Sequence, residues 1–207
     1  QGWFIGSEAG EALADVLTGK VNPSGKLPFT WPASLQDVGA HALKAYPGTW
    51  RADHKIIDEE YKEGIYVGYR WADAHHTQPL FAFGHGLSYT TFAYSQLRCS
   101  HDVIAPTDSV EVFVTVTNTG KVKGDEVVQL YIRDEVSSVT TYTKVLRGFE
   151  RITLNPGESR EVRFVLHPRD LSLWDKDMNF VVEPGDFRVM VGASSQDIRM
   201  ETKLQVQ

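Results

Sequence analysis

The chain has 207 residues, of which 42% are hydrophobic and 23% charged, a composition typical of a globular protein of one or two domains. Its formal net charge of -6 argues against nucleic-acid binding, which requires a basic surface. No apolar run approaches the roughly 20 residues of a membrane span, and no signal peptide is visible. Because Gln1 is an implausible native start, we expect the native N-terminus to lie upstream.

The first predicted element is a helix over Glu8–Leu17. Ser7 is expected to cap its first amides, and Gly19 is a natural stop. Apolar residues recur at helical spacing and form a face that must be covered by a core: Ala12, Leu13, Val16 and Leu17.

Asn22–Gly25 predicts a turn, and Lys26–Trp31 a short extended segment at a sheet edge, because Pro28 cannot donate to a ladder. One helix and one strand cannot bury a core by themselves. We therefore interpret this region as the end of an α/β domain whose remainder comes from upstream residues or from another chain.

The next stretch is less regular. Ala33–Glu60 is polar and predicts a long excursion. Alternating bulky residues predict a strand at Gly64–Trp71, followed by a loop at Ala72–Gln78 and a short apolar run at Pro79–Phe83. Gly84-His85-Gly86 predicts a tight turn.

After about residue 100, strands and turns alternate to the end of the chain. Strands are predicted at Val110–Val116, Glu126–Ile132, Lys144–Phe149, Ser159–Leu166, Leu171–Trp174, Phe187–Val191 and Met200–Val206, and Arg151–Leu154 leads into a turn at Asn155–Gly157. About seven strands in some 100 residues without a disulfide indicate a β-sandwich of the fibronectin type III kind. The single cysteine, Cys99, is expected to be a small apolar residue in a strand rather than a reactive thiol.

Several motifs resemble the C-terminal part of glycoside hydrolase family 3, which includes many β-glucosidases and β-xylosidases. They are Glu11–Pro32, Tyr61–Phe92, Val114–Gly120, Gly124–Tyr131, Leu146–Phe149 and Glu183–Phe187, in the family's order. Ser7-Glu8-Ala9-Gly10 departs from the family's more usual Gln-Glu-Gly-Gly.

The resemblance implies a retaining exo-glycosidase that acts on terminal β-linked glucose or xylose and needs no cofactor. In that chemistry one carboxylate attacks the anomeric carbon and a second carboxyl group, about 5–5.5 Å away, protonates the leaving oxygen. The family's nucleophilic Asp lies in an N-terminal barrel and its acid/base Glu in the middle domain, so no catalytic residue is expected in this chain. The implied partners are the upstream barrel and α/β domain, with an oligosaccharide or aryl β-glycoside as substrate. The implied location is secreted or periplasmic.

Few residues of the chain itself are candidates for chemistry. The acidic run Asp58-Glu59-Glu60 with Glu63 is expected to be a solvated loop. His75-His76 lacks a third ligand at metal-binding spacing, so no metal site is expected. We interpret these two histidines as an exposed loop pair, with contact to the aglycone side of the substrate as the functional alternative and as our substrate-binding candidates.

Other notable residues have structural interpretations. His85 is expected to hydrogen-bond backbone carbonyls through its ring and to join two domains. Tyr66, Tyr69, Arg70 and Trp71 form either a sugar platform or, as we favour, an interdomain core. Trp174 is expected in the sandwich core or at its edge, whereas Trp3, Trp31 and Trp50 are ambiguous.

The sequence thus predicts a mainly β protein: a fibronectin type III-like β-sandwich preceded by a remnant of an α/β sandwich domain and a long irregular linker. The expected divisions are 1–32, 33–94 and 95–207. Two alternatives stay open at this point, a non-catalytic polysaccharide- or protein-binding module and a split enzyme whose catalytic domains form a separate chain.

Overall fold

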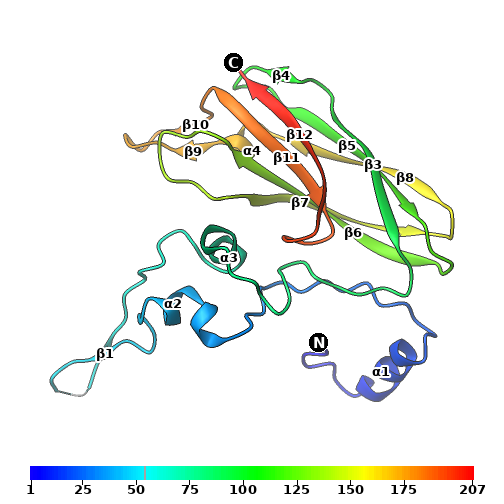
Figure 1. Ribbon diagram of the computed structural model, residues 1–207, viewed down its shortest axis with the longest axis horizontal. Coiled ribbons are helices and arrows are strands. Elements are labelled where there is room, and N and C mark those ends of the chain that lie inside the picture. Colours follow the sequence, from blue (N-terminus) through cyan, green and yellow to red (C-terminus); the bar gives the residue numbers. More distant parts are fainter. Residues whose placement is uncertain (54) are drawn as a thin grey trace.

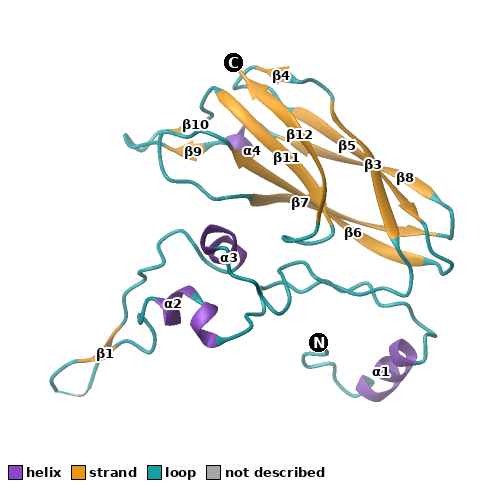
Figure 2. Ribbon diagram, in the orientation of Figure 1, coloured by secondary structure: helices purple, strands orange, loops and turns teal. Residues whose placement is uncertain are grey.

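A computed structural model of the chain describes residues 1–53 and 55–207, which form two unlike regions. Residues 92–207 build a β-sandwich, and the preceding residues run along one side of it as short helices and irregular segments (Figure 1). Figure 2 shows the contrast, with nearly all strands in the second region. The predicted mainly β fold with a fibronectin type III-like sandwich is confirmed.

The first region contains only short elements. They are α1 (Ala9–Leu17), η1 (Leu35–Asp37), α2 (Gly39–Ala42), β1 (Thr49–Trp50), β2 (Ile57–Asp58) and α3 (Tyr69–His75). β1 and β2 pair as a small antiparallel hairpin. No helix in the described residues has the length and apolar character needed to cross a membrane.

The second region contains ten strands and one short helix. They are β3 (Phe92–Cys99), β4 (Val103–Ile104), β5 (Val110–Asn118), β6 (Gly124–Asp134), β7 (Val145–Leu154), β8 (Ser159–Leu166), α4 (Pro168–Leu171), β9 (Leu173–Trp174), β10 (Phe180–Val181), β11 (Gly185–Gly192) and β12 (Ile198–Val206). One sheet has the order β4-β12-β11-β6-β7 and the other β3-β5-β8, while β9 and β10 form a separate hairpin.

The core lies between the two sheets, where alternating residues of each strand point inward. In β5 the four valines at positions 110, 112, 114 and 116 have no exposed surface. In β8, the neighbouring strand of the same sheet, Val162, Phe164 and Leu166 lie beside these valines and point into the same core, as the sequence predicts. Leu130 and Val189 complete the core from the opposite sheet.

β6 is buried on both of its faces. Leu130 faces the core, and Gln129 and Tyr131 point to the other side, yet they are 3% and 0% exposed. The first region covers that outer face: the Tyr131 ring lies edge-on to the Tyr69 ring of α3, with centroids 6.1 Å apart. The outer face of β6 is therefore part of the contact between the two regions.

Two predictions for the first region are wrong. Gly64–Trp71 is not a strand, because Gly64 and Gly68 have φ of +58° and +64° and interrupt any extended run. The residues predicted as strand end and loop instead form α3, a stretch that includes Ala72 and Ala74. Ser7 does not cap α1, whose N-cap is Glu8 with no side-chain cap hydrogen bond.

Strand limits also differ in the second region. The strand predicted at Lys144–Phe149 continues to Leu154 as β7, with a register shift opposite Leu130 and Tyr131 of β6. β3 begins at Phe92, three residues before the expected start of the sandwich at residue 95. The three proposed domain divisions themselves stay predictions.

Candidate functional site

The acidic run lies on the surface, as the sequence predicts. The Arg51 guanidinium donates to both carboxylate oxygens of Asp58 within 3.0 Å, across the β1–β2 hairpin. Glu60 lies 3.0 Å from the Lys62 ammonium. Such exposed ion pairs contribute little to stability. That the chain contains no catalytic residue remains a prediction.

Glu63 differs from these carboxylates because one of its oxygens is buried. Its Oε2 has no hydrogen-bond partner among the described residues, and neither does Nε1 of Trp71, which is 6% exposed. Both residues line a cavity of about 110 Å³. Asp37 also lines it, but its carboxylate accepts hydrogen bonds from Ser34.

α3 places the two predicted histidines differently. The His75 ring stacks on the Trp71 indole with centroids 3.5 Å apart, and its Nδ1 lies 3.1 Å from the Trp71 carbonyl. His76 ends the helix in a left-handed conformation, with φ of +53°. Both side chains are exposed, but they lie at a helix end rather than in the predicted loop.

Polar contacts anchor α3 to the sandwich. The Leu146 amide donates to the Tyr69 hydroxyl at 3.0 Å. The Lys144 ammonium lies 2.7 Å from Oδ1 of Asp73, and both side chains are at most 11% exposed. Burial raises the pKa of Asp73, although the Lys144 charge opposes this rise. Tyr69 therefore packs between the two regions, as the favoured interpretation has it, whereas Trp71 packs on His75 and against Gly39 within the first region.

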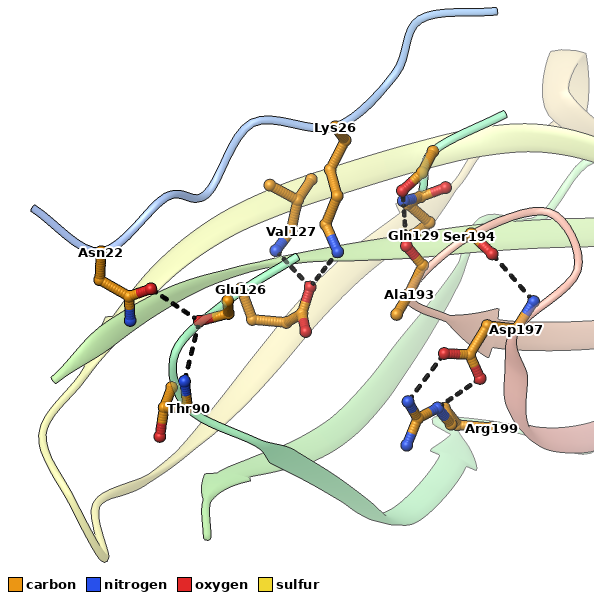
Figure 3. Close-up of polar contacts among 12 residues, drawn as sticks. Asn22, Lys26, Thr90, Glu126, Val127, Gln129, Ala193, Ser194, Asp197 and Arg199 are labelled. Carbon is orange, nitrogen blue, oxygen red and sulfur yellow. Dashed lines mark hydrogen bonds and ion pairs between the residues drawn. The ribbon is translucent and has the colours of Figure 1, made fainter. Parts of the chain in front are cut away.

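A second buried ion pair also links the two regions (Figure 3). The Lys26 ammonium, from the extended segment after α1, lies 2.9 Å from Oε1 of Glu126 in β6. The Glu126 side chain is 8% exposed and also accepts the Val127 amide at 2.8 Å. Removing one partner of such a pair leaves an unpaired buried charge, which is strongly destabilising.

Asn22 holds the turn before Lys26 against the chain that enters β3. Its Oδ1 accepts the Tyr89 amide at 2.8 Å and the Ser88 hydroxyl at 3.1 Å, and its Nδ2 donates to the Lys123 carbonyl at 3.1 Å. The Tyr89 hydroxyl in turn donates to the Val16 carbonyl of α1 at 2.6 Å. The predicted turn is therefore part of the junction.

The Gly84-His85-Gly86 turn also joins the two regions, but through its backbone. Nε2 of Gln129 donates to the Gly84 carbonyl at 3.3 Å and to the Ala193 carbonyl at 2.7 Å. The Leu27 amide donates to the His85 carbonyl at 2.9 Å. The prediction that the His85 ring makes these bonds is wrong: the ring packs against Phe81 at 5.2 Å and makes no hydrogen bond to the described residues.

A polar cavity of about 280 Å³ opens beside this junction. Arg199 and Asp197 form one side, with the guanidinium donating to both carboxylate oxygens at 2.5 and 2.7 Å (Figure 3). The Tyr94 hydroxyl, close to this cluster, is buried and has no partner among the described residues. Burial, and next the charge of Glu126, raise the pKa of Tyr94 well above its usual value.

A row of aromatic side chains follows the exposed side of the first region. Trp3, Phe29, Trp31, Phe81 and His85 are neighbours in that order, with centroid separations of 5.2 to 6.5 Å. α1 has no buried residue, and its Leu17 is 72% exposed. Most of the apolar face predicted for this helix is therefore exposed among the described residues, with Val16 alone of the four partly buried.

Two other single-residue predictions have clear outcomes. Cys99 lies in β3, and burial raises the pKa of its thiol to about 11, so it is not a reactive thiolate. Trp174 is 58% exposed in the β9–β10 hairpin, where its ring lies 5.1 Å from that of Phe180. The prediction that it fills the core or edge of the sandwich is wrong.

Sequence reasoning missed the residues that make the junction: Lys26, Glu126, Gln129, Asp73 and Lys144. One signal was present. The run from Val127 to Ile132 is almost continuously apolar, which indicates a strand covered on both faces. A glutamine and a tyrosine within that run indicate a polar contact under the cover.

Comparison with known proteins agrees with this architecture. Residues 1–89 match the glycosyl hydrolase family 3 C-terminal domain, and residues 126–195 match the fibronectin type III-like domain. A β-glucosidase of Bacteroides ovatus is 49% identical over 96% of the chain, and a β-xylosidase of Formosa agariphila 44% identical over 97%. The chain covers 26% and 25% of these two proteins.

Solved structures give the same result. A family 3 β-glucosidase of Bifidobacterium adolescentis superposes with a TM-score of 0.88 at 35% identity, over all of this chain and 29% of its own. β-Glucosidase 3B of Thermotoga neapolitana, in complex with glycerol, superposes with a TM-score of 0.86 at 40% identity, over 98% of this chain and 27% of its own. The chain therefore belongs to glycoside hydrolase family 3 and corresponds to the C-terminal part of the enzymes that it matches.

Proposed function

We propose that the protein containing this chain is a retaining exo-acting β-glycosidase that releases terminal β-linked glucose, and that this segment braces its catalytic domains. The observation that supports this most is the 49% identity to a β-glucosidase across nearly the whole chain. The stand-alone binding module is not favoured, because β-glucosidases match both regions in one continuous segment.

The two carboxyl groups of the reaction come, in this proposal, from residues outside the chain. Retaining hydrolysis needs a nucleophile and an acid about 5–5.5 Å apart. Asp58 and Glu60 are exposed and paired with cations, and Asp37 is engaged by Ser34. Glu63 has a free oxygen but no second free carboxylate in its cavity.

The bracing role follows from the junction. Lys26, Asn22 and Gly84 tie the segment after α1 and the segment before β3 to one strand, β6, or to its flanking loop. The exposed face of α1 and the aromatic row from Trp3 to His85 then form the surface on which the barrel and α/β domain pack. These domains belong to the same protein or to a separate chain that copurifies with it.

The segment also shapes the cleft entrance through the end of α3. We assign the aglycone contact to the His75–His76 pair, and chiefly to His76, because the His75 ring is already stacked on Trp71. His76 makes no side-chain hydrogen bond to the residues that the structure describes. In the whole enzyme, His76→Ala should raise KM for an aryl β-glucoside several-fold and leave kcat unchanged. An unchanged KM would contradict the assignment of the aglycone contact to His76.

A chromogenic aryl β-glucoside tests the main proposal. The whole protein should hydrolyse it with retention of configuration, and Glu63→Gln should keep kcat within about twofold. The 207-residue chain alone should be inactive. Hydrolysis by that chain, abolished by replacing one of its own carboxylates, would contradict the proposal.

We further propose that the protein is secreted or periplasmic. One relative, 37% identical over 95% of the chain, is the periplasmic β-glucosidase of Salmonella typhimurium. Cell fractionation of the source organism tests this, and recovery of the full-length protein in the cytoplasm alone would contradict it.

A further inference from the structure

The cavity of about 280 Å³ at the junction has walls from both regions of the chain. Its volume is near the lower end of the roughly 300–1,000 Å³ of ligand pockets, so it fits only a small molecule. Its walls are rich in charged and hydroxyl-bearing side chains rather than in apolar ones. Its lining includes Lys26, Ser88, Phe92, Glu126, Asp197 and Arg199.

One wall holds a buried acceptor beside a buried donor. Glu126 is 6% exposed, and its Oε1 is bound by Lys26 and the Val127 amide. Both of these contacts end on Oε1, as Figure 3 shows, and no described residue donates a hydrogen bond to Oε2. The Lys26 ammonium carries three protons and directs one to Glu126 at 2.9 Å. A free acceptor and free donor protons are thus held a few ångströms apart.

The other wall adds a further donor. Arg199 uses Nε and Nη2 to bind Asp197, and its Nη1 makes no hydrogen bond within the described part of the chain. The pairing fixes the plane of the guanidinium. Phe92 supplies an apolar surface, and the Ser88 hydroxyl, held by Asn22, adds a polar one.

The charges select against ions. A bound anion would lie against Glu126 and Asp197, and a bound cation against Lys26 and Arg199. Each of these charges already has a counter-charge, and so does the third carboxylate of the lining, Asp125, which pairs with Arg151; the cavity therefore holds no unpaired charge of either sign. No group of three or more histidine, cysteine, aspartate or glutamate side chains suited to a metal ion occurs among the described residues. A neutral hydroxyl group fits both requirements, because it accepts from Lys26 or Arg199 and donates to Glu126.

We propose that this cavity binds a small polyhydroxylated neutral molecule, a monosaccharide or a polyol, whose hydroxyl groups bridge Glu126, Lys26 and Arg199. Because the ligand would contact both regions, its binding should stabilise the junction. The proposal does not require the protein to be a glycosidase.

The test is titration of glucose, of glycerol and of 1-propanol into the whole protein by isothermal calorimetry, with wild type, Arg199→Met and Arg163→Met in parallel. Arg163 is the matched control, since it forms an exposed ion pair with Glu111 on the other sheet and does not line the cavity. Exposed pairs of this kind contribute little to stability, so both variants should fold. If Arg199→Met has a lower melting temperature than wild type, Asp197→Asn should be used in its place.

We expect glucose, glycerol or both to bind wild type and Arg163→Met alike, to bind Arg199→Met at least tenfold more weakly, and 1-propanol not to bind. Binding of glucose alone identifies a monosaccharide site, and binding of glycerol alone a polyol site. Because the proposed active site would itself bind glucose, the signal that counts is binding that is kept in Arg163→Met and lost in Arg199→Met. Identical isotherms for wild type and Arg199→Met, or no difference between glycerol and 1-propanol, overturn the proposal and leave a water-filled cavity. Hydrolysis of a glucoside is read at the active site, so failure there is separate from failure here.

Discussion

The two regions of the chain bury their apolar side chains in different ways. In the sandwich, the four inward valines of β5 have no exposed surface, and both sheets contribute to one closed core. In the first region, α1 buries no residue and Phe4 is fully exposed. The sandwich therefore contains its own hydrophobic core, whereas the first region packs on the sandwich along β6 and leaves most of α1 exposed.

The largest effect on stability that tests this comparison is expected at the junction along β6. Lys26→Met should lower the free energy of unfolding by about 3–5 kcal/mol, because Glu126 then stays buried without a counter-charge. Chemical denaturation of the whole protein measures the loss. The double variant Lys26→Met, Glu126→Leu should recover most of it, since apolar replacement of a buried pair is often neutral. If Lys26→Met alone is neutral, the pair does not hold the junction.

Paired truncations sharpen the same comparison. Leu130→Ala, at a core position with no exposed surface, should cost about 2–5 kcal/mol of stability. Leu17→Ala removes the same atoms from a side chain that is 72% exposed in this chain. In the isolated chain it should therefore change stability by no more than about 0.5 kcal/mol.

In the whole protein, however, Leu17→Ala should approach the cost of Leu130→Ala, because the proposed α/β domain covers α1. Thermal unfolding of both variants in both contexts gives the four values needed. A neutral Leu17→Ala in the whole protein would mean that nothing packs on this helix.

How far the sequence predicted the structure also differs between the regions. In the sandwich, the period-2 pattern of β5 and β8 predicted where each strand lies and which of its side chains point into the core. It could do so because one face of each strand is buried and the other is not. In the first region, Gly64–Trp71 shows a similar alternation but forms a turn and a helix. There the backbone follows glycines at positive φ and contacts to β6, which are distant in sequence.

The junction itself was not predictable residue by residue. Lys26 and Glu126 are 100 positions apart, and a lone lysine or glutamate normally indicates a solvated surface. Only the fold brings them together. His85 stood out in the sequence because of its flanking glycines, but the glycine backbone, not the imidazole, makes the contact.

Gly84→Ala tests that backbone contact directly. Gly84 has φ of +80°, and an added Cβ would collide with the side-chain amide of Gln129. The variant should lose about 1–3 kcal/mol beyond backbone strain, because Gln129 must give up hydrogen bonds to Gly84 and Ala193. Gly157→Ala is the matched control, with φ of +76° and open space around it. Equal losses in the two variants would show that the Gln129 contact contributes nothing.

The smallest expected effect concerns pH. Burial raises the pKa of Asp73 in the folded state above its unfolded value of about 3.9. Between those two values the folded protein binds more protons than the unfolded chain, so the contribution of Asp73 to stability falls as pH rises and is constant above the folded pKa. The slope from one group cannot exceed about 1.4 kcal/mol per pH unit.

Denaturation curves from pH 3.5 to 7 for wild type and Asp73→Asn isolate the pH-dependent contribution of Asp73, since the asparagine variant lacks it. Identical pH profiles would show that the Lys144 charge offsets burial completely, and that this end of α3 is held without an electrostatic cost.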